Sequence, residues 1–265
     1  MNHTPELGVA APELGWVPSP TWVLRRAAVL EHVRSWPRGR VLDMGCGAGA
    51  LLHDLDRRGF SGLGVELSGP ARDLGQKLAV ELDGFRIVDR IPPDSPPFDH
   101  LISLEVLEHI EDDRGALSSW VEHLKEGGRV LLSVPADPKR WDLTDVLAGH
   151  FRRYDRDGVR DLVTGVGLRV DRIETYGFPA TWVIARVRRA VRESQVRRQG
   201  VDVEAIGTGD LDRTKRSGIE RSVETRLFPL YGSWPGRKVM SAAARVQRLF
   251  RETDRGISYL VVARK

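Results

Sequence analysis

Cysteine is almost absent from this chain, with one residue, Cys46, among 265. A single thiol cannot form an intrachain disulfide, which excludes a disulfide scaffold and agrees with a reducing compartment. The sequence also lacks any run of eighteen apolar residues, so it predicts no membrane-spanning helix. Because its first residues lack the basic-then-apolar pattern of an export signal, we expect a cytoplasmic protein.

Glycine is plentiful, and three glycines alternate with small residues in the segment 45–49 (Gly-Cys-Gly-Ala-Gly). Val41 and Leu42 precede this turn as a buried strand would, and a helical pattern begins at Ala50. A strand, a glycine turn and a helix in succession open a nucleotide-binding α/β unit. Glycine suits the turn because its backbone reaches positive φ and because a side chain would block a ligand lying against it.

An acidic residue, Glu66, ends the next apolar segment, 62–65. A carboxylate at that place can accept hydrogen bonds from both hydroxyls of a ribose. The glycine spacing is Gly-x-Gly-x-Gly, whereas dinucleotide-binding turns have Gly-x-Gly-x-x-Gly. This difference disfavours a nicotinamide-dependent dehydrogenase.

Residues 41–49, together with Glu66, resemble the first two motifs of the class I S-adenosylmethionine-dependent methyltransferases. The segments 85–89, 98–104 and 124–135 resemble the later motifs of that family, in the same order. The resemblance covers about residues 40–178. It implies a Rossmann-like α/β fold, with a seven-stranded, mostly parallel sheet, helices on both faces and a helical insertion before the last strand.

The resemblance also implies S-adenosylmethionine as the methyl donor. The glycine turn would hold its methionine end with Asp43 near the ammonium group, Glu66 would bind the ribose, and Asp89 would lie at the adenine. The expected cofactor-binding residues are Asp43, Gly45, Gly47, Gly49, Glu66, Asp89 and Leu104.

An acid–histidine segment follows the fourth predicted strand. Glu105, Glu108 and His109 have the spacing i, i+3 and i+4, which predicts that one helical face carries all three. The segment is similar to ubiquinone-pathway O-methyltransferases and to small-RNA 2′-O-methyltransferases, and the resemblance implies His150 as a further metal ligand. A divalent metal at these four residues is compatible with the sequence but not expected, because acid–histidine pairs also occur in metal-free methyltransferases. His109 and His150 are our candidate catalytic residues, as general bases.

Shortly after His150, the side chains of Arg152, Arg153 and Tyr154 could hold an anionic acceptor through forked hydrogen bonds. The alternative is that they form ion pairs within the protein.

The pattern divides the chain into three parts. Residues 1–20 show no hydrophobic period, which predicts a loose N-terminus, and a helix capped by Thr21 follows. The methyltransferase domain is expected over 21–178 and 257–265. Residues 179–256 form an insertion with 17 Lys and Arg against 9 Asp and Glu, although the whole chain carries only +4. We expect basic helices over 182–192 and 238–251 and a mobile loop over 200–218, serving as a lid, an acceptor surface or a dimer surface.

The sequence thus predicts an S-adenosylmethionine-dependent methyltransferase acting on an O, N or C nucleophile of a small metabolite or of a lipid or sugar intermediate. A homodimer and peripheral contact with an anionic surface are both compatible with it, and nucleic acid is not expected as a partner. One alternative is an RNA 2′-O-methyltransferase, which the basic insertion favours but the lack of interleaved stacking aromatics does not. The other is a non-catalytic binding protein that retains the donor fold.

Overall fold

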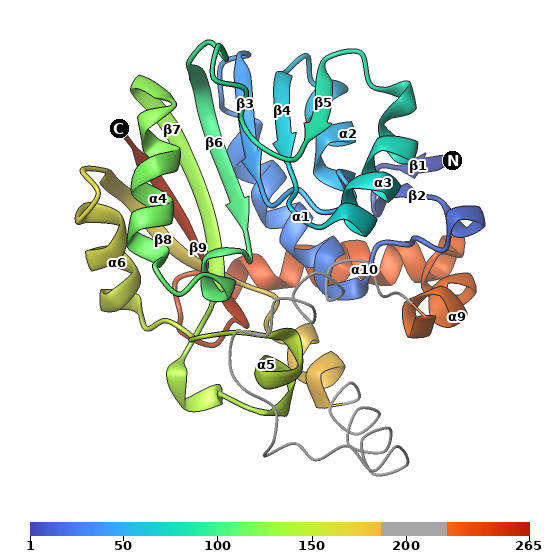
Figure 1. Ribbon diagram of the computed structural model, residues 1–265. Coiled ribbons are helices and arrows are strands. Elements are labelled where there is room, and N and C mark those ends of the chain that lie inside the picture. The colour runs from blue at the N-terminus through green and yellow to red at the C-terminus, as the bar shows by residue number, and fades with distance from the viewer. Residues whose placement is uncertain (187–221) are drawn as a thin grey trace.

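The computed structural model describes residues 1–186 and 222–265. Its centre is a seven-stranded sheet with the order β5-β4-β3-β6-β7-β9-β8 (Figure 1). The strands are β3 (Arg40–Met44), β4 (Ser61–Val65), β5 (Phe85–Val88), β6 (Phe98–Leu104), β7 (Leu124–Pro135), β8 (Arg169–Tyr176) and β9 (Ser258–Arg264). Five neighbouring strands pair in parallel, in the order β5, β4, β3, β6 and β7. β9 pairs antiparallel with both β7 and β8. The predicted Rossmann-like α/β fold with a mostly parallel sheet is confirmed.

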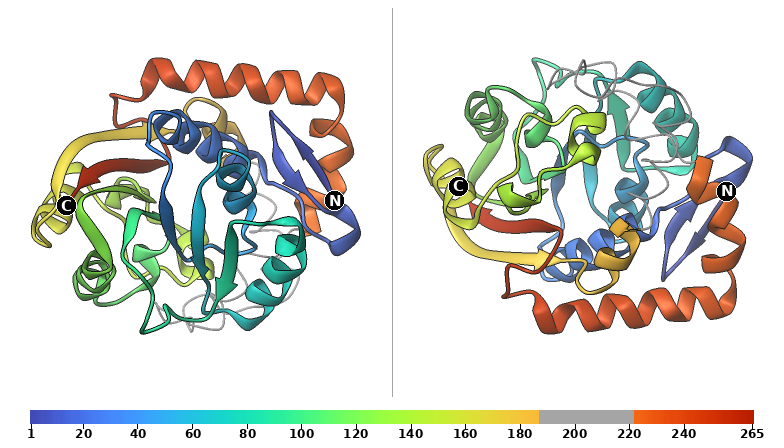
Figure 2. Two further views of the ribbon diagram at one scale, coloured as in Figure 1. Left: turned by 90° about the horizontal axis from the view of Figure 1, so that it is seen from above. Right: turned by 90° about the horizontal axis from the view of Figure 1, so that it is seen from below.

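Helices cover both faces of this sheet, because successive strand residues point to opposite sides (Figure 2). Val41 lies in one apolar cluster with residues of α1 (Pro20–Val33) and α2 (Ala50–Asp56). Its neighbour Leu42 lies in another, with residues of α4 (Asp113–Glu122) and α6 (Arg156–Thr164). α3 (Gly69–Leu78) packs beside β5, and α5 (Leu143–Ala148) follows β7 in the chain. The two buried layers leave the ends of the strands as the place for a ligand.

The N-terminus corrects one prediction. Residues 1–20 contain a hairpin of β1 (Asn2–Thr4) and β2 (Gly8–Ala10), and Val9 and Trp16 are buried against Ala48 and Ala50 of the glycine turn and α2. The expectation of a loose segment was wrong, because three-residue strands are too short to show a period. The cap of α1 is also different, since Ser19 rather than Thr21 accepts a hydrogen bond from a backbone N–H of the first turn.

The described part of the insertion is helical. It contains residues 180–186, α9 (Ser222–Tyr231), α10 (Trp234–Val246) and the short η5 (Gln247–Phe250). α10 packs along α1, with Met240 buried against Val23 and Leu24. The predicted loop 200–218 and the second half of the predicted helix 182–192 lie outside the described residues. Among the helices that are described, none combines the length and the apolarity needed to cross a bilayer.

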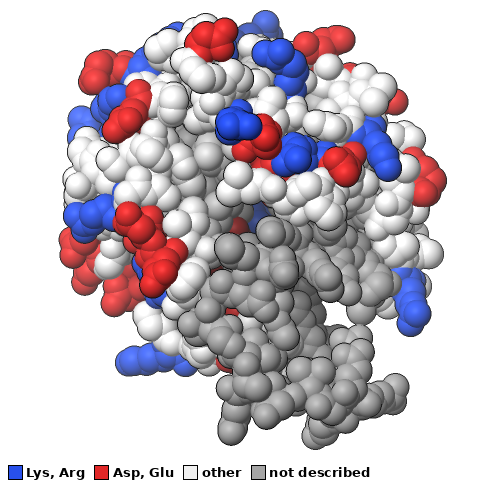
Figure 3. Space-filling view, in the orientation of Figure 1, with Lys and Arg blue, Asp and Glu red and all other residues white. Residues whose placement is uncertain are grey.

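Charged side chains of both signs are interspersed over the face of the described residues that Figure 3 presents. Several arginines from the insertion pair with acids elsewhere, as Arg248 and Arg251 do with Glu31 on α1.

Candidate active site

The glycine turn follows the carboxyl end of β3, and hydrogen bonds fix it to the carboxyl end of β4. The backbone N–H groups of Gly45 and Cys46 both donate to the carbonyl of Val65, at 2.8 and 3.1 Å. Gly45, Gly47 and Gly49 all have positive φ, between 56° and 73°. A Cβ at Gly47 would have no atom within 4 Å, so its surface is open to a ligand.

Glu66 stands directly beside this turn, at the end of β4. Its Oε2 accepts a hydrogen bond from the Gly47 N–H at 2.9 Å, and its Oε1 accepts one from the Ser68 N–H at 2.7 Å. Because each carboxylate oxygen can accept two hydrogen bonds, one position on each remains for a hydroxyl. The geometry suits a ribose with two neighbouring hydroxyl groups.

Asp43 is the acidic group expected near the ammonium of the donor. It lies near the end of β3 and only 3% of it is exposed. Burial, together with the negative charge of Glu66, raises the pKa of Asp43 to about 7. A cationic group of a ligand at this place would therefore favour its ionised form.

Two further expected cofactor residues lie at the carboxyl ends of β5 and β6. These ends are on the same side of the sheet as that of β3, because the strands are parallel. Asp89 follows β5, is half exposed and pairs with Arg90 at 3.7 Å. Leu104 is the last residue of β6 and packs against the cluster on the α1 side. The structure thus brings Asp43, the turn and Glu66 together, and it places Asp89 one strand farther out.

The predicted helix that begins at Glu105 does not form. Glu105 has a φ of 60°, a left-handed conformation that turns the chain away from β6. Only one 3₁₀ turn follows, over Leu107–His109, and α4 begins after its cap, Asp112. Glu105 therefore does not share a helical face with Glu108 and His109, and the four-residue metal set is corrected to exclude it.

Instead, Glu105 joins four elements of the fold. Its Oε1 accepts hydrogen bonds from the hydroxyls of Ser133 on β7 and Tyr176 on β8, at 2.9 and 3.0 Å. Its Oε2 accepts one from Ser258 on β9 at 3.1 Å, and Arg25 on α1 lies 3.6 Å away. These partners satisfy the carboxylate, so Glu105 has a structural role here. Sequence reasoning missed it because the partners are far apart along the chain.

Glu108, His109 and His150 are brought together. One ligand atom from each lies within 4.8 Å of the others. Glu108 is 0% exposed, and neither of its carboxylate oxygens has a hydrogen-bond partner among the described residues. Burial and the nearby charge of Glu105 raise the pKa of Glu108 well above its usual range. Burial and the neighbouring His150 lower the pKa of His109 to about 4, so its imidazole is neutral at pH 7.

Asp145, at the start of α5, orients His150. Its Oδ1 lies 2.8 Å from His150 Nδ1, and Arg153 Nε donates to both of its oxygens at 2.9 Å. Burial alone would raise the pKa of Asp145, but the hydrogen bonds from His150 and Arg153 lower it. An ionised Asp145 keeps the proton of a neutral His150 on Nδ1, so that Nε2 carries the lone pair. The sequence offered no sign of this role, because Asp145 also reads as part of a helix cap.

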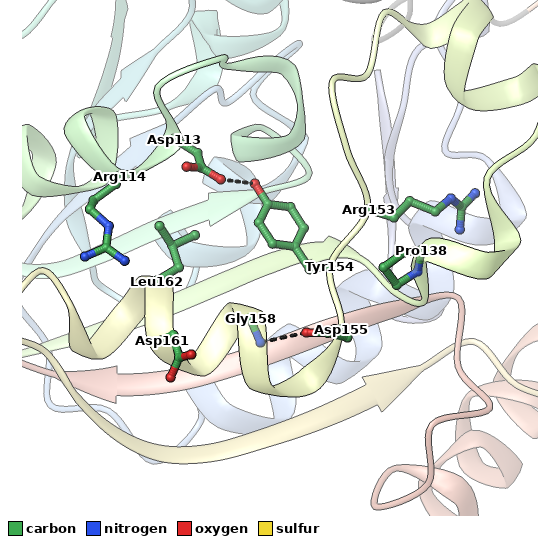
Figure 4. Close-up of a pocket in the computed structure, with 9 residues that line it drawn as sticks. All are labelled: Asp113, Arg114, Pro138, Arg153, Tyr154, Asp155, Gly158, Asp161 and Leu162. Carbon is green, nitrogen blue, oxygen red and sulfur yellow. Dashed lines mark hydrogen bonds between the residues drawn. The ribbon is translucent and has the colours of Figure 1, made fainter.

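Arg152, Arg153 and Tyr154 make the intraprotein contacts that were the alternative to anion binding. Arg152 pairs with Asp113 at 2.8 Å, and the Tyr154 hydroxyl donates to the same carboxylate at 2.7 Å. Figure 4 shows Tyr154 directed toward Asp113 and Arg153 extending the other way. The pocket drawn there, of about 280 Å³, is lined by no residue of the glycine turn, so it is separate from the expected donor site.

The sequence matches the protein family described as "Methyltransferase domain" over residues 23–173. The chain belongs to this family. The match and the fold confirm the resemblance to class I S-adenosylmethionine-dependent methyltransferases. The position of the match agrees with the part of the sheet that holds the glycine turn and Glu66.

Curated relatives include the ubiquinone biosynthesis O-methyltransferase of Alkalilimnicola ehrlichii, 33% identical over 100 residues, which are 36% of this chain and 40% of that protein. The mitochondrial enzyme of the same description from Schizosaccharomyces pombe is 31% identical over 157 residues, 56% of this chain and 57% of the relative. The chain spans about half the length of the curated relatives it matches. A solved structure, a putative sarcosine dimethylglycine methyltransferase from Galdieria sulphuraria, has a TM-score of 0.55 and 13% identity and covers 99% of this chain and 94% of its own. That likeness shows the fold.

Proposed function

We propose that this methyltransferase-family protein transfers a methyl group from S-adenosylmethionine to an O, N or C nucleophile of a small metabolite or of a lipid or sugar intermediate. The observation that carries the proposal is the contact between Glu66 and the Gly47 N–H, beside an open glycine surface. It supplies a ribose acceptor and close backbone approach at one sheet edge. The curated relatives named as O-methyltransferases support the reaction class.

Each group at the site has a role in this proposal. Bound S-adenosylmethionine supplies a methyl group already activated on a sulfonium. Glu66 holds the ribose hydroxyls, and ionised Asp43 attracts the ammonium of the methionine end. The protein's main task is then to place the acceptor in line with the methyl group. Where the acceptor must lose a proton, His150 Nε2, oriented by Asp145, accepts it, with neutral His109 alongside.

Donor binding is tested by calorimetric titration of S-adenosylmethionine and its demethylated product into the parent chain and into Glu66→Ala. Loss of hydrogen bonds to a charged acceptor should weaken binding by at least about tenfold. Asp73→Ala is the matched control, because Asp73 is an exposed acid on α3. Binding that is equal in the parent and in Glu66→Ala would remove the ribose assignment, and a parent that binds neither compound would refute the function.

The acceptor is found by incubating the protein with isotopically labelled donor and a panel of phenols, amines, sugar and lipid intermediates and RNA oligonucleotides, read by mass spectrometry. Label in a small molecule supports the proposal, and label in RNA supports the RNA alternative. Donor binding without transfer to any class supports the non-catalytic alternative.

A divalent cation is a second candidate component of the site, favoured by the unpartnered oxygens of Glu108. One carboxyl group and two imidazoles, with Asp145 hydrogen-bonded to His150, fit the donor set of such an ion. Glu108, His109 and His150 would hold it, and it would lower the pKa of an acceptor hydroxyl when bound.

Calorimetric titration with Mn²⁺, Mg²⁺ and Zn²⁺ tests whether Glu108 is a metal ligand or a buried, protonated acid. A metal site should bind in the parent and lose the ion in Glu108→Gln, whereas Glu111→Gln, an exposed neighbour, should bind normally. Absence of binding in the parent, or activity that survives exhaustive chelation, would exclude the metal.

A further inference from the structure

The outer face of α10 carries an apolar stripe that no described element covers. Val239, Ala242 and Val246 on α10 and Leu249 on the following η5, which we call the α10 stripe, are spaced by three or four residues and so lie on one side of this helical segment. Val239 is 67% exposed, Val246 40% and Leu249 79%. The opposite side of α10 is already packed on α1 through Met240. The stripe is therefore not needed to attach the helix to the domain.

Cations lie along the same helical segment as this stripe. Lys238 and Arg245 lie on the helix turns beside it, both exposed, and residues 234–250 contain no Asp or Glu. Trp234, 66% exposed, begins the helix with the Lys238 ammonium 5.7 Å from its ring centre. Leu230 on α9, 71% exposed, extends the apolar surface past Trp234. This distribution differs from the face in Figure 3, where the two signs of charge are interspersed.

We propose that the α10 stripe docks the protein on a membrane surface that contains anionic phospholipids. Exposed aliphatic side chains along one helix, a neighbouring row of cations and an interfacial tryptophan are the features of a helix lying in the headgroup region. Anionic headgroups complement the charges of Lys238 and Arg245.

The arrangement of the helix suits a broad surface. Figure 2 shows α10 running along one side of the molecule, outside α1. Its stripe residues Val239, Val246 and Leu249 are exposed, so a deformable bilayer can contact all of them. A second copy of the chain is disfavoured, because pairing two such faces would bring the same cations together. Glu6 pairs with Lys238 at 3.7 Å, and Glu31, on the helix α1 against which α10 packs, pairs with Arg248 at 2.9 Å.

Co-sedimentation with vesicles tests the proposal without reference to methyl transfer, so that its outcome is independent of the proposed function. The full chain should sediment with vesicles of phosphatidylglycerol and phosphatidylcholine, should stay in solution with phosphatidylcholine alone, and should be released as salt increases. The double substitution Val239→Asp with Leu249→Asp should lower partitioning by at least about tenfold. Lys238→Glu with Arg245→Glu should lower it as well.

The matched control is Val80→Asp, which places the same charge at an 81% exposed valine away from α10 and should bind like the parent. Thermal melts show that each variant is folded. The proposal is overturned if the parent does not bind anionic vesicles, if it binds neutral ones equally, or if the stripe variants bind like Val80→Asp. It is also overturned if sedimentation velocity shows a dimer that Val239→Asp with Leu249→Asp dissociates, because a second copy then occupies the stripe.

Discussion

At the scale of single residues, Asp43 bears on both the stability of the fold and the proposed binding of the donor. It is a buried carboxyl whose pKa is about 7, so that ionising it within the folded protein is unfavourable. The folded state retains its proton between pH 3.8 and about 7, where an unfolded chain has lost it. The stabilisation from this group is therefore fully present below pH 3.8 and is lost progressively as the pH rises from 3.8 to about 7.

We predict that Asp43→Asn is more stable than the parent at pH 8, because asparagine removes the buried charge. The increase in the free energy of unfolding should be on the order of 2 to 4 kcal/mol at pH 8 and should be less than half as large at pH 5, where folded Asp43 keeps its proton and only the unfolded carboxyl is ionised. Urea denaturation at the two pH values measures it. Donor affinity should fall in the same variant, since the ammonium loses its counter-charge. Equal stability of the two chains at pH 8 would show that Asp43 is not desolvated as described.

Roles that depend on one short segment could be predicted from the sequence, whereas roles that depend on partners far along the chain could not. The glycine turn and Glu66 could be identified because a short segment and the strand after it carry the whole signal. The roles of Glu105 and Asp145 could not be. Glu105 depends on Ser133, Tyr176 and Ser258, which only the folded sheet brings together.

At the scale of elements, the N-terminal hairpin packs against the glycine turn of the expected donor site. Val9 of the hairpin and Trp16, which follows it, pack with Ala48 of the glycine turn and Ala50 of α2. The hairpin is tied to the domain by Arg26, which hydrogen-bonds both oxygens of Asp54 and the carbonyl of Pro5. No periodicity could predict this, because the attachment depends on one buried ion pair and a few isolated apolar side chains.

We predict that Asp54→Ala lowers the free energy of unfolding by about 3 to 5 kcal/mol, because it leaves the buried Arg26 guanidinium without its counter-charge. Burial alone would raise the pKa of Asp54, but hydrogen bonds from Arg26 and His3 lower it. The parent should therefore lose this stabilisation as the pH falls below 4. Urea denaturation measures the change, and Asp73→Ala, at an exposed acid, should stay within about 0.5 kcal/mol of the parent.

At the scale of the whole molecule, the layered sheet could be predicted because apolar runs alternate with amphipathic helices along the chain. The exceptions are places where tertiary contacts decide the local conformation. Glu105 is in a left-handed conformation and its carboxylate is bound by three other strands, so the helix expected there is replaced by a single turn. The helix predicted over 238–251 overlaps α10 and η5, but its packing on α1 could not be read from the pattern.

β9 lies between β7 and the edge strand β8, and we predict that Leu260→Ala on it lowers the free energy of unfolding by about 2 to 5 kcal/mol. Leu260 is 1% exposed, between residues of β7 and β8. Unfolding should remain one cooperative transition, which denaturation followed by near- and far-ultraviolet dichroism would show. Val80→Ala, at an exposed site, is the control, and a loss as small as the control's would indicate that the strand is not tightly packed.

The position of β9 also bears on how the polypeptide folds during synthesis. Among the described strands, β8 lies at the edge of the sheet and pairs with β9 alone, and the entire insertion separates the two in the chain. The five parallel strands can assemble as they leave the ribosome, since all of them precede β8. β8 must then wait unpaired while the insertion is translated, and in that interval its open edge is available to chaperones or to another nascent chain.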